Sequence, residues 1–168
     1  MWQRRTFHEC ASELRHISED FRVAHTNRRG WDQPTRERVM RDTSIRGVEV
    51  LRILALSIRS DQDYGRTPKV PDSVGAFRRT ATASEAAAFI KSYRPPYSRL
   101  TGFVPLSLRE ALNKIAHPHP DRWGFYADDH THDLILTGDN GGRSWIAVVS
   151  LIDLCGVIQA LPDADTQT

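Results

Sequence analysis

The stretch HDLILTGDNGGRSWIAVVSLIDLCGVIQAL, residues 132–161, changes its hydrophobic period twice and thereby decides the fold class. Apolar residues alternate with other residues in HDLILTG and in RSWIAVV, which is typical of strands. The intervening DNGG has two glycines that permit the positive φ angles of a hairpin turn. Ser150 and Asp153 then begin an apolar helix. With WGFYAD just upstream, the pattern predicts an antiparallel β-meander at about 123–149, followed by a C-terminal helix.

The chain before the meander carries helical signals. Ser107 and Glu110 form a capping box that opens a helix, and Pro118 ends that helix near His117. The buried stripe of this helix is predicted to contain Leu108, Ala111, Leu112, Ile115 and Ala116. Thr82 and Glu85 form a second capping box.

Two longer helices are predicted nearer the N-terminus. The first has an apolar stripe between Phe7 and Ala24, and the second is expected to be capped by Thr35 and to be most buried after Gly47. Residues 60–81 lack a sustained period and predict a long connection with at most one helical turn. The sequence therefore predicts a single domain over 1–168 of the α+β class, mainly α. It combines a bundle of four or five helices with the small meander and ends in a polar tail at about 162–168.

Composition narrows the function only slightly. The net charge is +2, and no run of apolar residues is long enough for a signal peptide or a membrane span, so we expect a cytoplasmic protein without membrane contact. Cys10 and Cys155 form no metal-binding motif and are expected to be reduced, buried thiols.

A polar row on the helix that starts at Ser107 is the main candidate site. Arg109, Asn113 and His117 are four residues apart and share one helix face. The carbonyl end of a helix favours a protonated imidazole, which suits His117 to general acid–base chemistry. Arg109 could neutralise a phosphate, and Asn113 could orient the ring.

The segment LREALNKIAH, residues 108–117, resembles the signature helix of the HEPN superfamily. Those proteins are helical bundles, and many are metal-independent RNases of toxin–antitoxin and phage-defence systems. The family motif is an arginine, a polar residue, three further residues and a histidine. Asn113 and His117 match the polar residue and the histidine, whereas Leu112 occupies the place of the arginine. Arg109, about one turn earlier, is the nearest replacement.

The resemblance implies an RNA-acting protein in which a ribose 2′-hydroxyl attacks the adjacent phosphate. His117 would be the general acid/base, Asn113 would orient it, and Arg109 would bind the phosphate. Lys114, His119 and Arg122 are expected to contact RNA. The resemblance further implies a homodimer, with an antitoxin or another protein as partner, and neither a metal nor another cofactor.

Three alternatives stay open. The substitution at Leu112 favours a non-catalytic, dimerising interaction module of the same fold. His117, His119, His130 and His132, with nearby aspartates, could instead form the metal site of a hydrolase. Finally, the ring of His117 could merely cap its helix while the other histidines lie in solvent.

Overall fold

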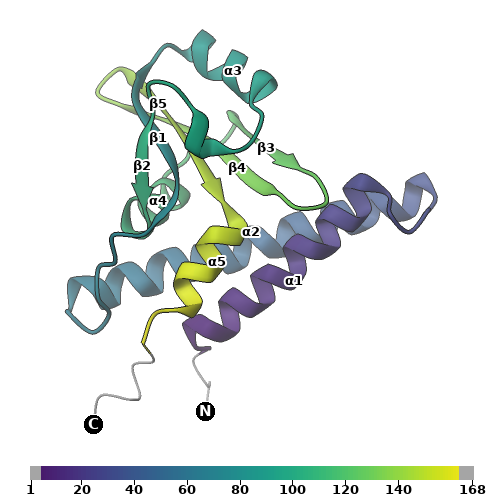
Figure 1. Cartoon of the computed structure of the whole chain (residues 1–168), viewed down its shortest axis with the longest axis horizontal. Helices are drawn as coiled ribbons and strands as arrows, with labels where there is room; N and C mark the ends of the chain where they lie inside the picture. The colour runs from purple at the N-terminus through teal and green to yellow at the C-terminus, as the bar shows by residue number, and fades with distance from the viewer. Residues whose placement is uncertain (1–4, 163–168) are drawn as a thin grey trace.

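The computed structural model describes residues 5–162 and has an α+β architecture in which helices predominate, as the sequence predicts. The predicted polar tail lies, apart from Pro162, outside the described residues. Figure 1 shows the helices gathered around one central sheet. The helices are α1 (Phe7–Thr26), α2 (Gln33–Asp63), α3 (Ala83–Ser92), the short 3-10 helix η1 (Tyr97–Arg99), α4 (Leu108–Ala116) and α5 (Leu151–Gln159).

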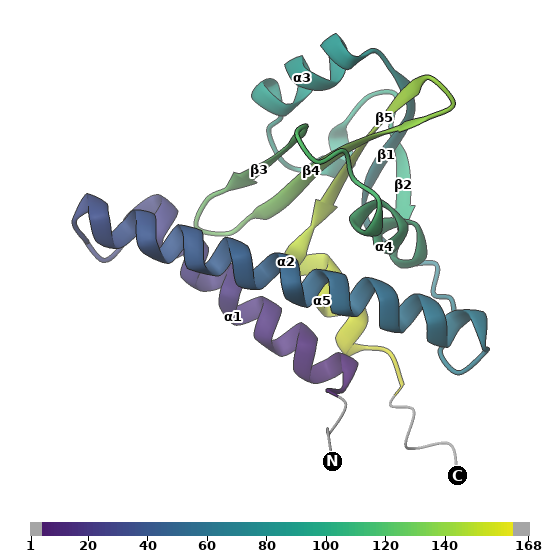
Figure 2. The ribbon, with the colours of Figure 1, turned by 180° about the vertical axis from the view of Figure 1, so that it is seen from behind.

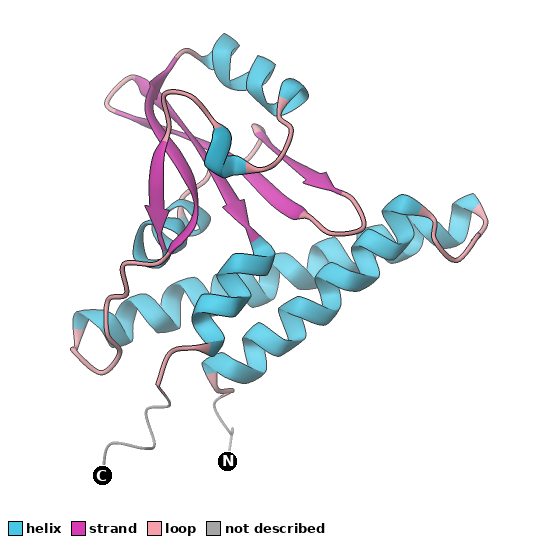
Figure 3. Cartoon of the chain, in the orientation of Figure 1, coloured by secondary structure: helices cyan, strands magenta, loops and turns pink. Residues whose placement is uncertain are grey.

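The sheet is antiparallel throughout and has the strand order β2-β1-β5-β4-β3. Figure 3 shows its strands in magenta. The strands are β1 (Ser73–Ala81), β2 (Val104–Ser107), β3 (Trp123–Ala127), β4 (His132–Asn140) and β5 (Arg143–Ser150). The predicted meander is confirmed as β3–β4–β5. Its β4–β5 turn places Gly141 and Gly142 at φ angles of 60° and 81°, the region that glycine tolerates best.

Strands β1 and β2 were not predicted, and the interpretation of residues 60–81 as a connection is wrong. Helix α2 runs to Asp63, and β1 begins only ten positions later at Ser73. In β1 the four consecutive residues from Val74 to Phe77 are buried, so the strand shows no apolar–polar alternation. Gly75 is needed there because a Cβ at this position would lie 1.9 Å from the carbonyl oxygen of Val148 on β5.

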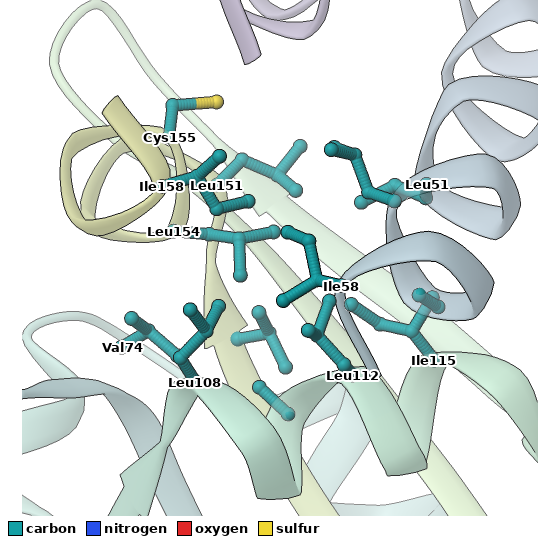
Figure 4. Packing of buried hydrophobic residues seen from close by; sticks show 14 of the residues in the cluster. Leu51, Ile58, Val74, Leu108, Leu112, Ile115, Leu151, Leu154, Cys155 and Ile158 are labelled. Carbon is teal, nitrogen blue, oxygen red and sulfur yellow. The ribbon is translucent and has the colours of Figure 1, made fainter. Parts of the chain in front are cut away.

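The two faces of the sheet carry different layers. Helices α1, α2, α4 and α5 cover one face, while α3 and the segment after it cover the other (Figures 1 and 2). Residues of β5 alternate between them: Trp145 and Val149 join the larger core, and Ile146 and Val148 join the core under α3. Figure 4 shows the larger core, where side chains of α2, α4 and α5 meet the sheet.

Most predicted helix ends are confirmed. The capping boxes of Thr82 with Glu85 and Ser107 with Glu110 are both present, and α4 ends at Ala116. Helix α2 begins earlier than predicted, because the Asp32 carboxylate, rather than Thr35, is the N-cap and accepts from the Thr35 amide. As expected, the burial of α2 is concentrated in the part from Gly47 onward.

Both cysteines are free and buried, as predicted. Burial raises the pKa of Cys10, and it raises that of Cys155 to about 11, so both thiols are unreactive apolar side chains. Between residues 5 and 162, no helix combines the length and apolar character needed to cross a membrane.

Candidate functional site

An apolar cavity of about 410 Å³ is the candidate site. It lies between α1, α2 and the helix-covered face of β3 and β4, and the segment that follows α4 closes one side. Most of its lining is aliphatic or aromatic. The lining includes Leu14, Ile17 and Phe21 of α1; Gly47, Val48 and Leu51 of α2; and Trp123, Phe125, Leu134 and Leu136 of the strands.

The alternation of β4 places His132 in the wall of this cavity. His132, Leu134 and Leu136 occupy every second position and therefore point to the same face of the sheet. The ring of His132 stacks on Phe21 with a centroid distance of 4.8 Å and meets Phe125 edge-on. The imidazole is therefore a polar group set into an aromatic wall.

His132 is neutral at physiological pH. Its side chain is nearly fully buried, and burial, reinforced by the positive charge of Arg22, lowers its pKa to about 4. Its Nδ1 lies 2.9 Å from the hydroxyl oxygen of Ser18 on α1. A neutral imidazole carries one ring N–H, so the partner of Nδ1 determines what Nε2 can do.

The burial of Ser18 determines which tautomer the His132 imidazole adopts. Ser18 is also buried, and its only side-chain hydrogen bond with residues 5–162 is the one to His132. A buried hydroxyl proton without an acceptor costs about 1–3 kcal/mol, so we assign Ser18 as the donor and Nδ1 as the acceptor. The ring proton then resides on Nε2, which is a free hydrogen-bond donor in a ring that lines the cavity.

The mouth of the cavity exposes apolar surface. Trp123 is 50% exposed, Val48 41% and Phe125 37%. His119 lies at the same rim, held by its backbone N–H donating to the Thr137 carbonyl at 2.6 Å. Large apolar side chains clustered around a concave opening are typical of a binding surface.

The predicted polar row on α4 does not converge on this cavity. The Arg109 guanidinium donates to the Arg59 carbonyl at 2.9 Å and to the Asp63 carboxylate at 2.7 Å, so it joins α4 to the end of α2. His117 is eight residues further on, about 12 Å along a helix axis. Neither these two residues nor Asn113 lines the cavity.

His117 itself is exposed. Its ring makes no hydrogen bond or ion pair with residues 5–162, so it does not cap the helix with its side chain. Leu112, in the place of the motif arginine, is fully buried in the larger core. A leucine at this position is therefore explained by packing.

The predicted RNA contacts lie in three different surroundings. The Lys114 ammonium sits 4.3 Å from the ring centroids of both Phe77 and Trp145, and burial lowers its pKa. His119 belongs to the cavity rim. Arg122 lines a shallow polar hollow beside the β4–β5 turn, together with Arg78 and Arg143.

The histidines considered as metal ligands do not come together. His130 is exposed in the β3–β4 turn, where its backbone N–H donates to Asp128, whereas His132 is buried in β4. Within residues 5–162, no three His, Cys, Asp or Glu side chains are close enough to hold a metal ion.

The pairing of Ser18 with His132 and the cavity beside it were not predicted from the sequence. The alternation of His132 with Leu134 and Leu136 could have placed this histidine on the buried face of its strand. Nothing local could have found Ser18, because it is 114 residues away in the sequence.

No protein-family model, curated protein or solved structure matches this chain.

Proposed function

We propose that this protein is a binding module that takes a small, largely apolar molecule into the cavity between α1, α2 and the sheet. The observation that carries the proposal is the cavity itself: about 410 Å³, lined mainly by apolar side chains, with the partly exposed Trp123 at its mouth. Small-molecule sites in proteins have about 300–1,000 Å³ and this kind of lining.

The polar groups of the cavity suit binding better than hydrolysis. Ser18 and His132 are at hydrogen-bond distance, as a nucleophile and its base would be. However, an imidazole with a pKa of about 4 is a weak base at neutral pH. Its second nitrogen also has no carboxylate partner among the described residues. We therefore assign His132 to ligand recognition through its Nε2–H group.

A series of straight-chain alcohols tests the proposal. Each methylene that enters the cavity contributes about 0.8 kcal/mol, which is about fourfold in Kd. We expect Kd to fall by this factor with each added methylene from hexanol to octanol and to level off once the cavity is full. Calorimetry gives Kd, and tryptophan fluorescence should respond because Trp123 lies at the mouth. In Trp123→Phe, binding should persist while the fluorescence response shrinks.

A matched pair of variants locates the binding. Ala116 lines the cavity at the end of α4, whereas Ala87 is exposed on α3 across the sheet. Ala116→Leu should weaken octanol binding at least tenfold by filling the space, and Ala87→Leu should leave it unchanged. Absence of saturable binding to the folded wild type, or equal binding by both variants, would contradict the proposal.

We propose RNA recognition around His117 as a second candidate function. The observation that favours it is the exposed ring of His117, which has no partner in residues 5–162 and lies close in sequence to Arg122. Arg78 and Arg143 also line the hollow that Arg122 lines, and these three arginines outnumber its two carboxylates, Glu85 and Asp139, so its net charge is positive. The homodimer and the antitoxin partner implied by the HEPN resemblance stay predictions.

Labelled RNA, incubated with and without EDTA, tests the second candidate. EDTA-resistant cleavage that is lost in His117→Ala would support a HEPN-like RNase. Arg109→Ala should reduce cleavage only in proportion to lost folding, because Arg109 is bound to Asp63. If the folded wild type neither binds nor cleaves RNA, this candidate is rejected and the cavity proposal is unaffected.

A further inference from the structure

The permanent charge in the cavity lining is positive. Arg52 is the one side chain in its lining with a permanent charge, and no Asp or Glu within residues 5–162 joins it. The two histidines of the lining are His119 and the neutral His132. The electrostatic environment therefore favours a neutral or negatively charged ligand over a cation.

Arg52 is available to a ligand. It is exposed on α2, one turn after Val48 at the mouth, and makes no hydrogen bond or ion pair with residues 5–162. The nearest acidic residue along α2 is Glu49, whose carboxylate lies 4.0 Å from the guanidinium of Arg46. The guanidinium of Arg52 is thus a fixed positive charge beside an apolar opening, with its hydrogen-bond donors unused.

Only the mouth can accommodate an ionised group. A carboxylate placed among Leu14, Phe21 and Leu136 would lose its hydration without a charged partner, which is strongly unfavourable. At the mouth it stays partly hydrated and can accept two parallel N–H bonds from a guanidinium. The apolar part of such a molecule would still fill the cavity.

We infer that the preferred ligand is an amphiphilic monocarboxylate, with its apolar body in the cavity and its carboxylate on Arg52. This inference rests on the proposed apolar binding site. This assigns a head-to-tail orientation. The carboxylate faces solvent between α2 and the segment after α4, and the far end of the ligand lies beside the stacked rings of Phe21 and His132. The Nε2–H of His132 then favours ligands that carry a hydrogen-bond acceptor at that end.

Three probes of equal chain length test the inference: decanoate, decanol and decylamine. An Arg–carboxylate pair at a partly exposed site gives roughly a three- to tenfold gain. We therefore expect decanoate to bind that much more tightly than decanol, and decylamine to bind most weakly. The preference for decanoate should decrease as salt is added, because exposed charges are screened.

Two variants identify the charge responsible. In Arg52→Gln the preference should be lost, so that decanoate and decanol bind this variant with the same Kd. Arg41 is exposed on the same helix and does not line the cavity, so Arg41→Gln should leave the preference unchanged. Arg52→Lys should retain part of it.

The outcomes separate this inference from the proposed function. If decanol binds and decanoate binds no better, or if Arg52→Gln leaves the preference intact, the inference is overturned and the apolar site stands. If neither decanol nor decanoate binds the folded wild type, both fail.

Discussion

Two adjacent residues of β4, His132 and Asp133, point to opposite faces of the sheet and show how differently those faces are built. Both side chains are buried, and burial drives both toward their neutral forms. On the α3 face, Asp133 accepts a hydrogen bond from the Tyr93 hydroxyl at 2.7 Å, and Tyr93 packs edge-on against Tyr126. On the other face, His132 bonds Ser18 but keeps one ring nitrogen free beside a cavity.

The difference distinguishes a structural polar group from a recognition group. The tyrosine hydroxyl and carboxylate on the α3 face satisfy each other within a packed aromatic layer, and the high pKa of Tyr93 keeps that hydroxyl a donor. The imidazole on the cavity face is held by Ser18 and Phe21, yet it retains an unused ring N–H in the wall of the cavity. The cavity face is therefore the one that offers recognition chemistry.

The largest expected effect is the pH dependence of stability due to His132. Its pKa is lowered from 6.5 to about 4, so the unfolded chain binds more protons between these values and the folded state loses stability as the pH falls. The loss is on the order of 3 kcal/mol. His132→Gln removes this contribution, so the difference in unfolding free energy between wild type and variant should change by this amount between neutral pH and pH 4, which urea denaturation would measure. A variant with the same pH dependence as the wild type would contradict the assignment.

Asp133 should make the free energy of unfolding change with pH in the opposite direction, by a slightly smaller amount. Its pKa is raised from 3.8 to about 6, mainly by burial, so the folded state loses stability as the pH rises through this range. Asp133→Asn removes the ionisation and should gain on the order of 2–3 kcal/mol relative to the wild type above pH 6. Because the two slopes oppose each other, each single variant should be more pH-dependent than the wild type. Parallel curves of unfolding free energy against pH for all three proteins would contradict the opposite contributions assigned to His132 and Asp133.

A pair of glycine-to-alanine variants should separate a small change in stability from a change in ligand affinity. Gly47 in α2 and Gly156 in α5 are both helical, and an added Cβ would meet only Ile17, at 3.5 Å, in the first case and nothing in the second. Each glycine-to-alanine change should therefore stabilise the protein by about 0.5–1 kcal/mol. Only Gly47→Ala alters the cavity lining, so only this variant should bind octanol more weakly, by a few-fold. Equal affinities in both variants would place the ligand elsewhere.

The parts of the fold that could be predicted are those whose apolar residues follow a regular local spacing in the sequence. The meander follows from the alternation in β4 and β5, and the capping box at Ser107 together with Pro118 delimits α4. Strand β1 has no such pattern, because four consecutive residues at its start are buried. It lies inside the sheet, paired with β5 on one side and with β2 on the other. The sequence of β1 alone does not show that both faces of its first half are covered.

The site was less predictable because its contacts are long-range. Arg109 shared a helix face with His117 in the sequence, but its partner Asp63 lies 46 residues earlier. The cavity requires α1, α2, the segment after α4 and two strands to meet, and no local pattern encodes its volume. His132 was considered among the metal ligands, and only its distant contact with Ser18 reveals its role.

The most direct test is a titration of isotopically labelled protein with octanol, followed by amide and methyl chemical shifts. We expect saturable shifts at Ile17 of α1, Leu134 of β4 and the backbone amide of His132, all of which line the cavity. We also expect no shift at Ile90, which packs on the opposite face of the sheet. Shifts centred on Ile90 and its neighbours, or none at any concentration of octanol, would contradict the cavity as the functional site.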